Sequence, residues 1–133
     1  MKELIFTTRH EVVSEVTGKI IDDCMFEDTD DVFDMESFIS IAKKKLFAID
    51  KSETIIIYAS GLKILMQATY IAWMNLKFAP ESLGGYDMYP GRLIFAHHDN
   101  ETNRYRLFDA VTGEEYMAQK ECRSSDFCQS EEE

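Results

Sequence analysis

The pattern of apolar and polar positions is clearest in the middle of the chain. Residues 54–59 (TIIIYA) form an unbroken apolar run rich in β-branched side chains, which predicts a strand buried on both faces. Over residues 62–78, apolar side chains surround much of the helical circumference, which predicts a helix at the centre of the fold, with Trp73 in the core. Ser60 and Gly61 lie at the turn between these two elements.

Two helices and a short strand are predicted before this pair. Residues 2–7 can form the strand, and Thr8 and Glu11 then have the S/T-x-x-E spacing of a helix-capping box. The apolar residues that follow recur at helical intervals and predict one helix; they are Val12, Val13, Val16, Ile20, Ile21 and Cys24. A second helix is expected over residues 35–49, with Asp34 as its N-cap.

The last third of the chain has the pattern of strands and turns. Residues 93–97 and 105–109 are predicted to be strands, and residues 115–118 a further short one. This order predicts an α+β fold in which helices pack on one face of a mostly antiparallel sheet of four to five strands. A small three-layer α/β arrangement is the alternative. We expect residues 1–120 to form one globular domain and residues 121–133 to form an acidic, flexible tail.

The negative charge of the chain is concentrated in two segments. The chain holds 25 acidic and 14 basic residues, for a net charge of −11. Residues 22–36 contain eight acids and no base, and residues 122–133 contain four acids and one base, so 13 residues of each sign remain elsewhere. A neutral body with local acidity argues against direct nucleic-acid binding through a broad basic field. It favours a protein partner with a basic surface.

The candidate partner-binding residues are the acids of residues 22–36 together with Tyr and Met side chains of residues 81–92, here called the aromatic loop. Tyr and Met are favoured at interfaces because they carry large apolar areas. The candidates are Asp22, Asp23, Glu27, Asp28, Asp30, Asp31, Asp34, Glu36, Tyr86, Met88 and Tyr89. A calcium loop is not predicted, because a loop that starts at Asp28 has Phe33 and Ile39 where Gly and Glu are needed.

An alternative site for a small ligand is predicted at the strand-to-helix turn. Exposed N–H groups and the positive end of a helix favour an anion there, and Lys63 lies beside them. The candidate residues are Ser60, Gly61, Lys63, His97 and His98. No Gly-rich phosphate loop or nucleophile elbow accompanies them. Since neighbours in a strand point to opposite faces, His97 and His98 are not expected to chelate one metal.

Cysteine usage and hydropathy bear on location and cofactors. The chain has three cysteines, an odd and widely spaced set that favours a reduced, cytoplasmic compartment. The most apolar stretch, residues 62–78, carries Lys63, Gln67, Asn75 and Lys77, so it is expected to be a buried helix and not a membrane span. We expect no signal peptide, no cofactor and no metal.

These features favour a non-catalytic interaction protein. We expect it to bind a basic surface of a nucleic-acid-handling protein, in the general manner of phage or mobile-element inhibitors of restriction or CRISPR systems that mimic DNA. That likeness is one of composition, with no shared motif. The alternative is a small α/β nucleotide- or phosphoryl-ligand-binding domain or enzyme at Ser60 and Gly61. A homodimer through a strand edge or the aromatic loop is a third hypothesis.

Overall fold

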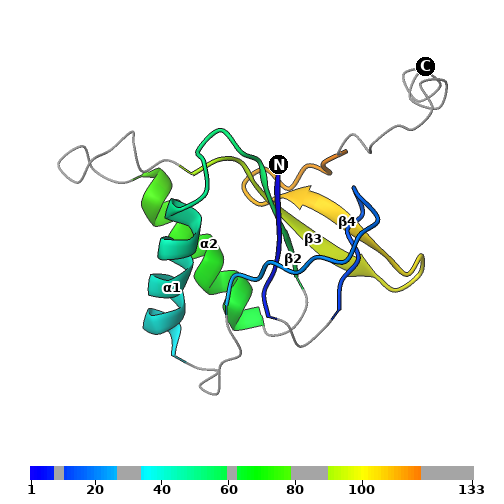
Figure 1. The fold of residues 1–133 in the computed structure, drawn as a ribbon. Helices are drawn as coiled ribbons and strands as arrows, with labels where there is room; N and C mark the ends of the chain where they lie inside the picture. Colours follow the sequence, from blue (N-terminus) through cyan, green and yellow to red (C-terminus); the bar gives the residue numbers. More distant parts are fainter. Residues whose placement is uncertain (8–10, 27–33, 60–62, 79–89, 118–133) are drawn as a thin grey trace.

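The computed structural model describes residues 1–7, 11–26, 34–59, 63–78 and 90–117. The acidic tail expected at residues 121–133 lies outside this part of the chain. Along the described chain, a strand and a helix alternate twice before two final strands (Figure 1). The elements are β1 (Lys2–Ile5), α1 (Met35–Phe47), β2 (Ile55–Tyr58), α2 (Lys63–Lys77), β3 (Leu93–Asp99) and β4 (Arg104–Asp109).

The four strands form one mixed sheet in the order β1-β2-β3-β4. β1 pairs with β2 and β2 with β3 in parallel, and only the pairing of β3 with β4 is antiparallel. The α+β class is confirmed, whereas the expectation of a mostly antiparallel sheet is wrong. Each helix carries the chain back to the end where the previous strand began, so the next strand runs in the same direction.

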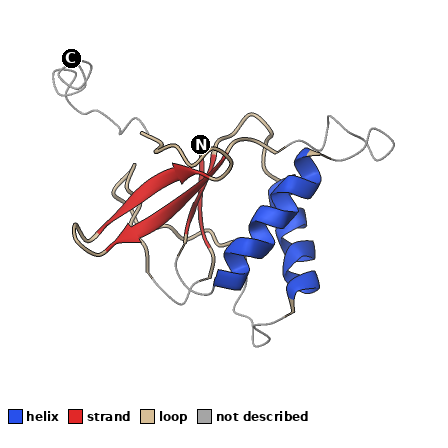
Figure 2. Cartoon of the chain, turned by 180° about the vertical axis from the view of Figure 1, so that it is seen from behind, coloured by secondary structure: helices blue, strands red, loops and turns tan. Residues whose placement is uncertain are grey.

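One face of the sheet is covered by both helices (Figure 2). Alternate side chains of the parallel strands point into this layer, where Ile55 and Ile57 of β2 meet Phe38 of α1 and Leu65 of α2. The predicted N-cap is confirmed, because the side chain of Asp34 accepts a hydrogen bond from the backbone N–H of Ser37 at 3.1 Å. Within the described residues, no helix is long and apolar enough to cross a membrane.

Trp73 connects α2 to the chain just before β3. Its ring is buried, as predicted, and its Nε1 donates a hydrogen bond to the carbonyl of Gly91 at 2.8 Å. A Cβ at residue 91 would overlap the backbone carbonyl of Glu53. Glycine therefore allows the chain before β3 to pass close to the chain before β2.

Residues 11–26 contain no helix, and the opposite face of the sheet is covered by residues 11–21 of this segment. The helix expected up to Cys24 is therefore wrong, and its capping residue Thr8 lies outside the described residues. Val13 and Ile20 form an antiparallel bridge, and the chain reverses between them. This segment contributes Val12, Val16 and Ile21 to an apolar cluster on that face, together with Ile56 and Tyr58 of β2.

The side chains of this segment alternate in burial, as in an extended chain. Val12 is 2% exposed, Val13 is 49% exposed and Ser14 is buried. Val12 and Val16 therefore fit a period of two as well as a helical period, and β-branched residues favour the extended form. Gly18 then supplies the turn with a φ of 75°, a conformation that glycine adopts at low cost.

A polar network fastens this segment to the sheet. The hydroxyl of Tyr58 accepts from the N–H of Glu15 at 2.9 Å and donates to the carboxylate of Glu3 at 2.8 Å. The hydroxyl of Ser14 donates to the same carboxylate at 2.6 Å. Burial first, and then the contact with Glu3, raises the pKa of Tyr58, so its hydroxyl stays protonated as a donor.

The chain after β4 adds a short extended piece to the sheet edge. Phe108 and Glu115 form an isolated antiparallel bridge, and the N–H of Tyr116 donates to the carbonyl of Leu107 at 2.7 Å. Of the further strand predicted over residues 115–118, the described part is thus a single bridge.

Removal of the Tyr58 hydroxyl tests this network. Tyr58→Phe leaves the N–H of Glu15 without that acceptor and removes a donor to Glu3. We expect the free energy of unfolding to fall by about 1–3 kcal/mol in urea denaturation. Tyr70→Phe, at a half-buried ring on α2, is the control and should change it little. Equal stability of Tyr58→Phe and wild type would contradict the role of the network.

Candidate functional site

A groove runs between α2 and the part of the sheet that the helices leave open. Its volume is about 590 Å³, within the range of small-molecule sites. α2 forms one wall, and β3, β4 and the turn after β4 form the other. The lining residues are Lys63, Met66, Gln67, Tyr70, Phe95, His97, Phe108, Asp109, Ala110 and Gly113.

The groove exists because the β3–β4 hairpin extends beyond the helix layer. In Figures 1 and 2 the helices lie together on one side, and the hairpin projects away from them. The lining residues of α2 begin at Lys63 and recur at intervals of three and four positions, so they lie on one face of that helix. This face contributes Lys63, Met66, Gln67 and Tyr70.

Aromatic rings make up the floor on the sheet side. Phe95 and Phe108 are directly paired across β3 and β4 and therefore share a face. His97 lies on the same face, with its ring centroid 6.4 Å from that of Phe95 and 6.1 Å from that of Phe108. Phe95 is buried, Phe108 is half-buried and His97 is exposed.

The structure separates the two histidines nominated from the sequence. His98 points to the other face of the sheet, where its ring lies 5.2 Å from that of Tyr105. Its ring nitrogens lie 3.0 Å from the side-chain oxygen of Asn100 and 3.1 Å from that of Asn103. Lys63 and His97 thus line one groove and His98 does not, while Ser60 and Gly61 lie outside the described residues.

The carboxylate of Asp109 is engaged beside the groove. It accepts from Arg92 at 2.6 Å and from the N–H groups of Val111 and Thr112. Burial alone would raise the pKa of Asp109, but the turn N–H groups and Arg92 together lower it. The acid is therefore ionised at neutral pH, and its charge is balanced by Arg92.

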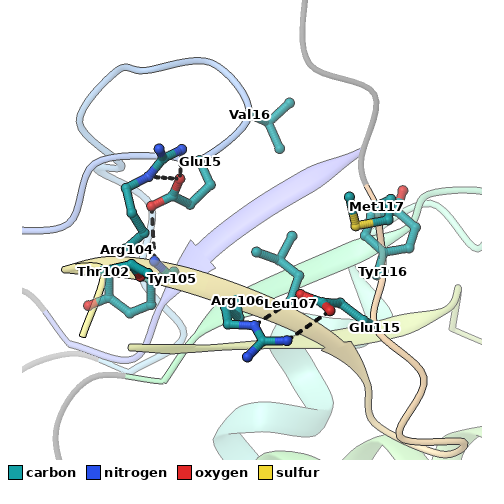
Figure 3. Close-up of a pocket in the computed structure, with 10 residues that line it drawn as sticks. All are labelled: Glu15, Val16, Thr102, Arg104, Tyr105, Arg106, Leu107, Glu115, Tyr116 and Met117. Atoms are coloured by element: carbon teal, nitrogen blue, oxygen red, sulfur yellow. Dashed lines mark hydrogen bonds and ion pairs between the residues drawn. The ribbon is translucent and has the colours of Figure 1, made fainter. Parts of the chain in front are cut away.

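A second, smaller depression lies at the outer edge of β4 (Figure 3). Glu15 binds Arg104 at 2.5 Å, and Glu115 binds Arg106 at 2.9 Å. Glu15 also accepts a hydrogen bond from the backbone N–H of Tyr105 at 3.0 Å. That contact occupies an outward-facing donor of the edge strand, which another strand would otherwise use.

The acidic segment has described residues at both of its ends. Asp23 binds Lys2 at 2.6 Å and Lys45 at 2.8 Å, so it links β1 to α1. Asp34 caps α1, and Asp22 and Glu36 are exposed. The remaining partner-binding candidates lie outside the described residues; they are Glu27, Asp28, Asp30, Asp31, Tyr86, Met88 and Tyr89.

No group of three or more His, Cys, Asp or Glu side chains in the described ranges could hold a metal ion. The groove residues missed in the sequence include Met66, Gln67, Tyr70, Phe95 and Phe108. Two sequence patterns could have identified most of them. The spacing of three and four residues from Lys63 places Met66, Gln67 and Tyr70 on its face of the helix, and alternation along the strand places Phe95 on the face of His97. Phe108 could be added only once the pairing of β3 with β4 was known.

Glu15 should protect the edge of β4 from self-association. Glu15→Ala removes an ion pair to an arginine of β4 and also exposes the N–H of Tyr105. Glu115→Ala removes an ion pair to an arginine of β4 while the backbone bridge remains, so it is the matched control. We expect the mass measured by light scattering to rise with concentration for Glu15→Ala only. Identical mass profiles for both variants and wild type would contradict this role.

Asp23 should make stability sensitive to acid. Partial burial would raise the pKa of Asp23, but the hydrogen bonds and charges of Lys2 and Lys45 lower it overall. The stabilisation is therefore complete above the ordinary pKa of about 3.9 and is lost as the pH falls through the lower folded value.

We expect Asp23→Asn to lower the midpoint of thermal unfolding at neutral pH. The difference from wild type should shrink on acidification below about pH 4, because wild-type Asp23 then becomes neutral too. Asp22→Asn, at the exposed neighbouring position, is the control and should leave the midpoint nearly unchanged. If the difference in midpoint between Asp23→Asn and wild type stays constant as the pH is lowered, the proposed link between the Asp23 pKa and stability is wrong.

No known protein family, no curated protein and no solved structure matches this chain.

Proposed function

We propose that this protein is a non-catalytic interaction protein whose acidic segment, residues 22–36, binds a basic surface of another protein. One observation carries the proposal: the structure fastens both ends of this segment to the folded body. Asp23 is held by Lys2 and Lys45 at one end, and Asp34 is held at the start of α1 at the other. Phe26, fully buried among aromatic rings, adds an apolar anchor.

This fastening fixes where the acidic segment leaves the described fold and where it returns to it. Two of the eight acids, Asp23 and Asp34, are used within the fold. The other six are Asp22, Glu27, Asp28, Asp30, Asp31 and Glu36. Carboxylates crowded into a short segment present an array of charge similar to that of a phosphate backbone, which attracts Lys- and Arg-rich surfaces.

The partner class that fits this chemistry is a nucleic-acid-handling protein. Its basic groove would bind the acidic segment in place of DNA or RNA, so the protein would act as an inhibitor. Phage or mobile-element inhibitors of restriction or CRISPR systems use this strategy in general terms. Because the rest of the chain is balanced in charge, we expect one local contact and not a whole-surface mimic.

Neutralisation of the six acids tests the proposal. The variant carries Asp→Asn and Glu→Gln at those positions and keeps Asp23 and Asp34, so the fold retains the contacts of both residues. Each form is immobilised and exposed to a purified DNA-binding protein with a basic groove and to an Arg- and Lys-rich peptide. We expect the wild type to retain both, with an affinity that falls steeply as salt rises, and the variant to retain neither.

The control variant carries Glu11→Gln, Glu101→Gln and Glu114→Gln, three exposed acids of the balanced body. It should bind like the wild type. Binding that is unaffected by salt, or that is lost equally in the control variant, would remove the proposal.

A second candidate function is the binding of a small phosphorylated ligand. The specific observation in its favour is that Lys63 and His97, nominated from different parts of the sequence, line one groove of about 590 Å³. Cationic and imidazole groups beside an apolar floor are typical of sites for small anionic ligands.

A further inference from the structure

We propose that the groove between α2 and the β3–β4 hairpin binds a nucleoside monophosphate, with the base on the aromatic floor and the phosphate at Lys63. This inference rests on the second candidate function and names its ligand class. Neither the acidic segment nor its partner takes part in it.

The floor is suited to a planar ring. Phe95, His97 and Phe108 lie on one face of two paired strands, with neighbouring ring centroids about 6 Å apart. Tyr70 lines the groove from the facing helix. Phe108 and Tyr70 are half-buried. The guanidinium of Arg106 lies over the Phe108 ring and the ring of Trp73 stacks with Tyr70, so an incoming base would stack on the parts of these rings that those partners leave exposed. Stacking on such side chains is a usual way in which proteins bind bases.

The charge at the groove is suited to an anion. Lys63 is exposed at one end of the helical wall. The acid of the lining, Asp109, is bound to Arg92 at 2.6 Å and to two turn N–H groups. The balance of charge on the lining therefore favours a negative group beside Lys63, and an ammonium group binds phosphate as a compact point charge.

Gln67 can supply contacts to the edge of a base. It lies four residues after Lys63 on the same face of α2 and is exposed in the groove. Its amide offers both a donor and an acceptor, the combination that matches the edge of a heterocycle. The groove thus places an anion contact, a polar contact and an aromatic floor along one small cavity.

Three probes separate the parts of this ligand. AMP carries the ring and the phosphate, adenosine carries the ring alone, and inorganic phosphate carries the anion alone. In isothermal titration with the full chain, we expect AMP to bind more tightly than either fragment by about tenfold or more. In NMR spectra, the signals that shift with AMP should come from α2, β3 and β4.

Two substitutions test the residues. We expect Lys63→Ala to weaken AMP binding by about tenfold, while Lys44→Ala, at an exposed lysine of α1 outside the groove, leaves it unchanged. Phe108→Leu keeps an apolar side chain and should also weaken AMP binding by about tenfold through the loss of stacking. Circular dichroism checks that each variant is folded.

The outcomes distinguish this inference from the function on which it rests. If phosphate alone binds as tightly as AMP, the groove is an anion site and the nucleotide inference is wrong. If adenosine binds as tightly as AMP, the contact at Lys63 is wrong. If no probe binds at millimolar concentration, both the inference and the second candidate function fail.

Discussion

Burial of β2 on both of its faces is the constraint on which the rest of the structure depends. The side chains of Ile55, Ile56, Ile57 and Tyr58 are all 0% exposed, and a strand of this kind needs an apolar layer above and below it. The two helices supply one layer, where Ile55 and Ile57 pack. The other layer comes from the reversing segment of residues 11–21, which covers Ile56 and Tyr58. Tyr58 ends the strand with a hydroxyl in this apolar layer, and the contacts of that hydroxyl with Glu3 and with the N–H of Glu15 hold the segment against the sheet.

The central elements could be predicted from the sequence because their local pattern admits one interpretation. The β-branched run of β2 and the apolar circumference of α2 each specify an element without reference to the rest of the chain. The direction of strand pairing could not be predicted in this way, because it depends on where each helix returns the chain. The helix expected over residues 12–24 failed for a different reason. Val12 and Val16 satisfy a period of two as well as a helical period, and the hydrogen bonds of Ser14 and the left-handed Gly18 favour the turn.

The candidate groove shows the same division between local and tertiary information. Alternation along β3 was enough to place His97 and His98 on opposite faces, and the structure has them so. His97 and Lys63 line one groove because α2 packs against the sheet. The spacing of residues along the sequence does not specify that packing. Phe108 entered the site through the register of β4 against β3, where it lies opposite Phe95. Sequence reasoning therefore found Lys63 and His97 of the groove and missed Phe95 and Phe108 of its floor, because apolar residues on regular elements are most often core.

An acidic segment and an anion-binding groove in one small protein influence each other through charge unless salt screens them. The fastened ends of the acidic segment lie at β1 and α1, whereas the groove is lined by α2, β3 and β4. However, α1 packs against α2, and the two helices begin at the same end of the helix layer (Figure 1). Lys63 therefore starts α2 at the end where Asp34 caps α1. The screening length at physiological salt is about 8 Å, so the acids at this end oppose an anion at Lys63 more strongly at low salt than at physiological salt. The charge of Asp109 adds little to this opposition, because Arg92 balances it at 2.6 Å. A basic partner bound to the acidic segment would reduce the opposition, so the two proposed binding surfaces are coupled through charge.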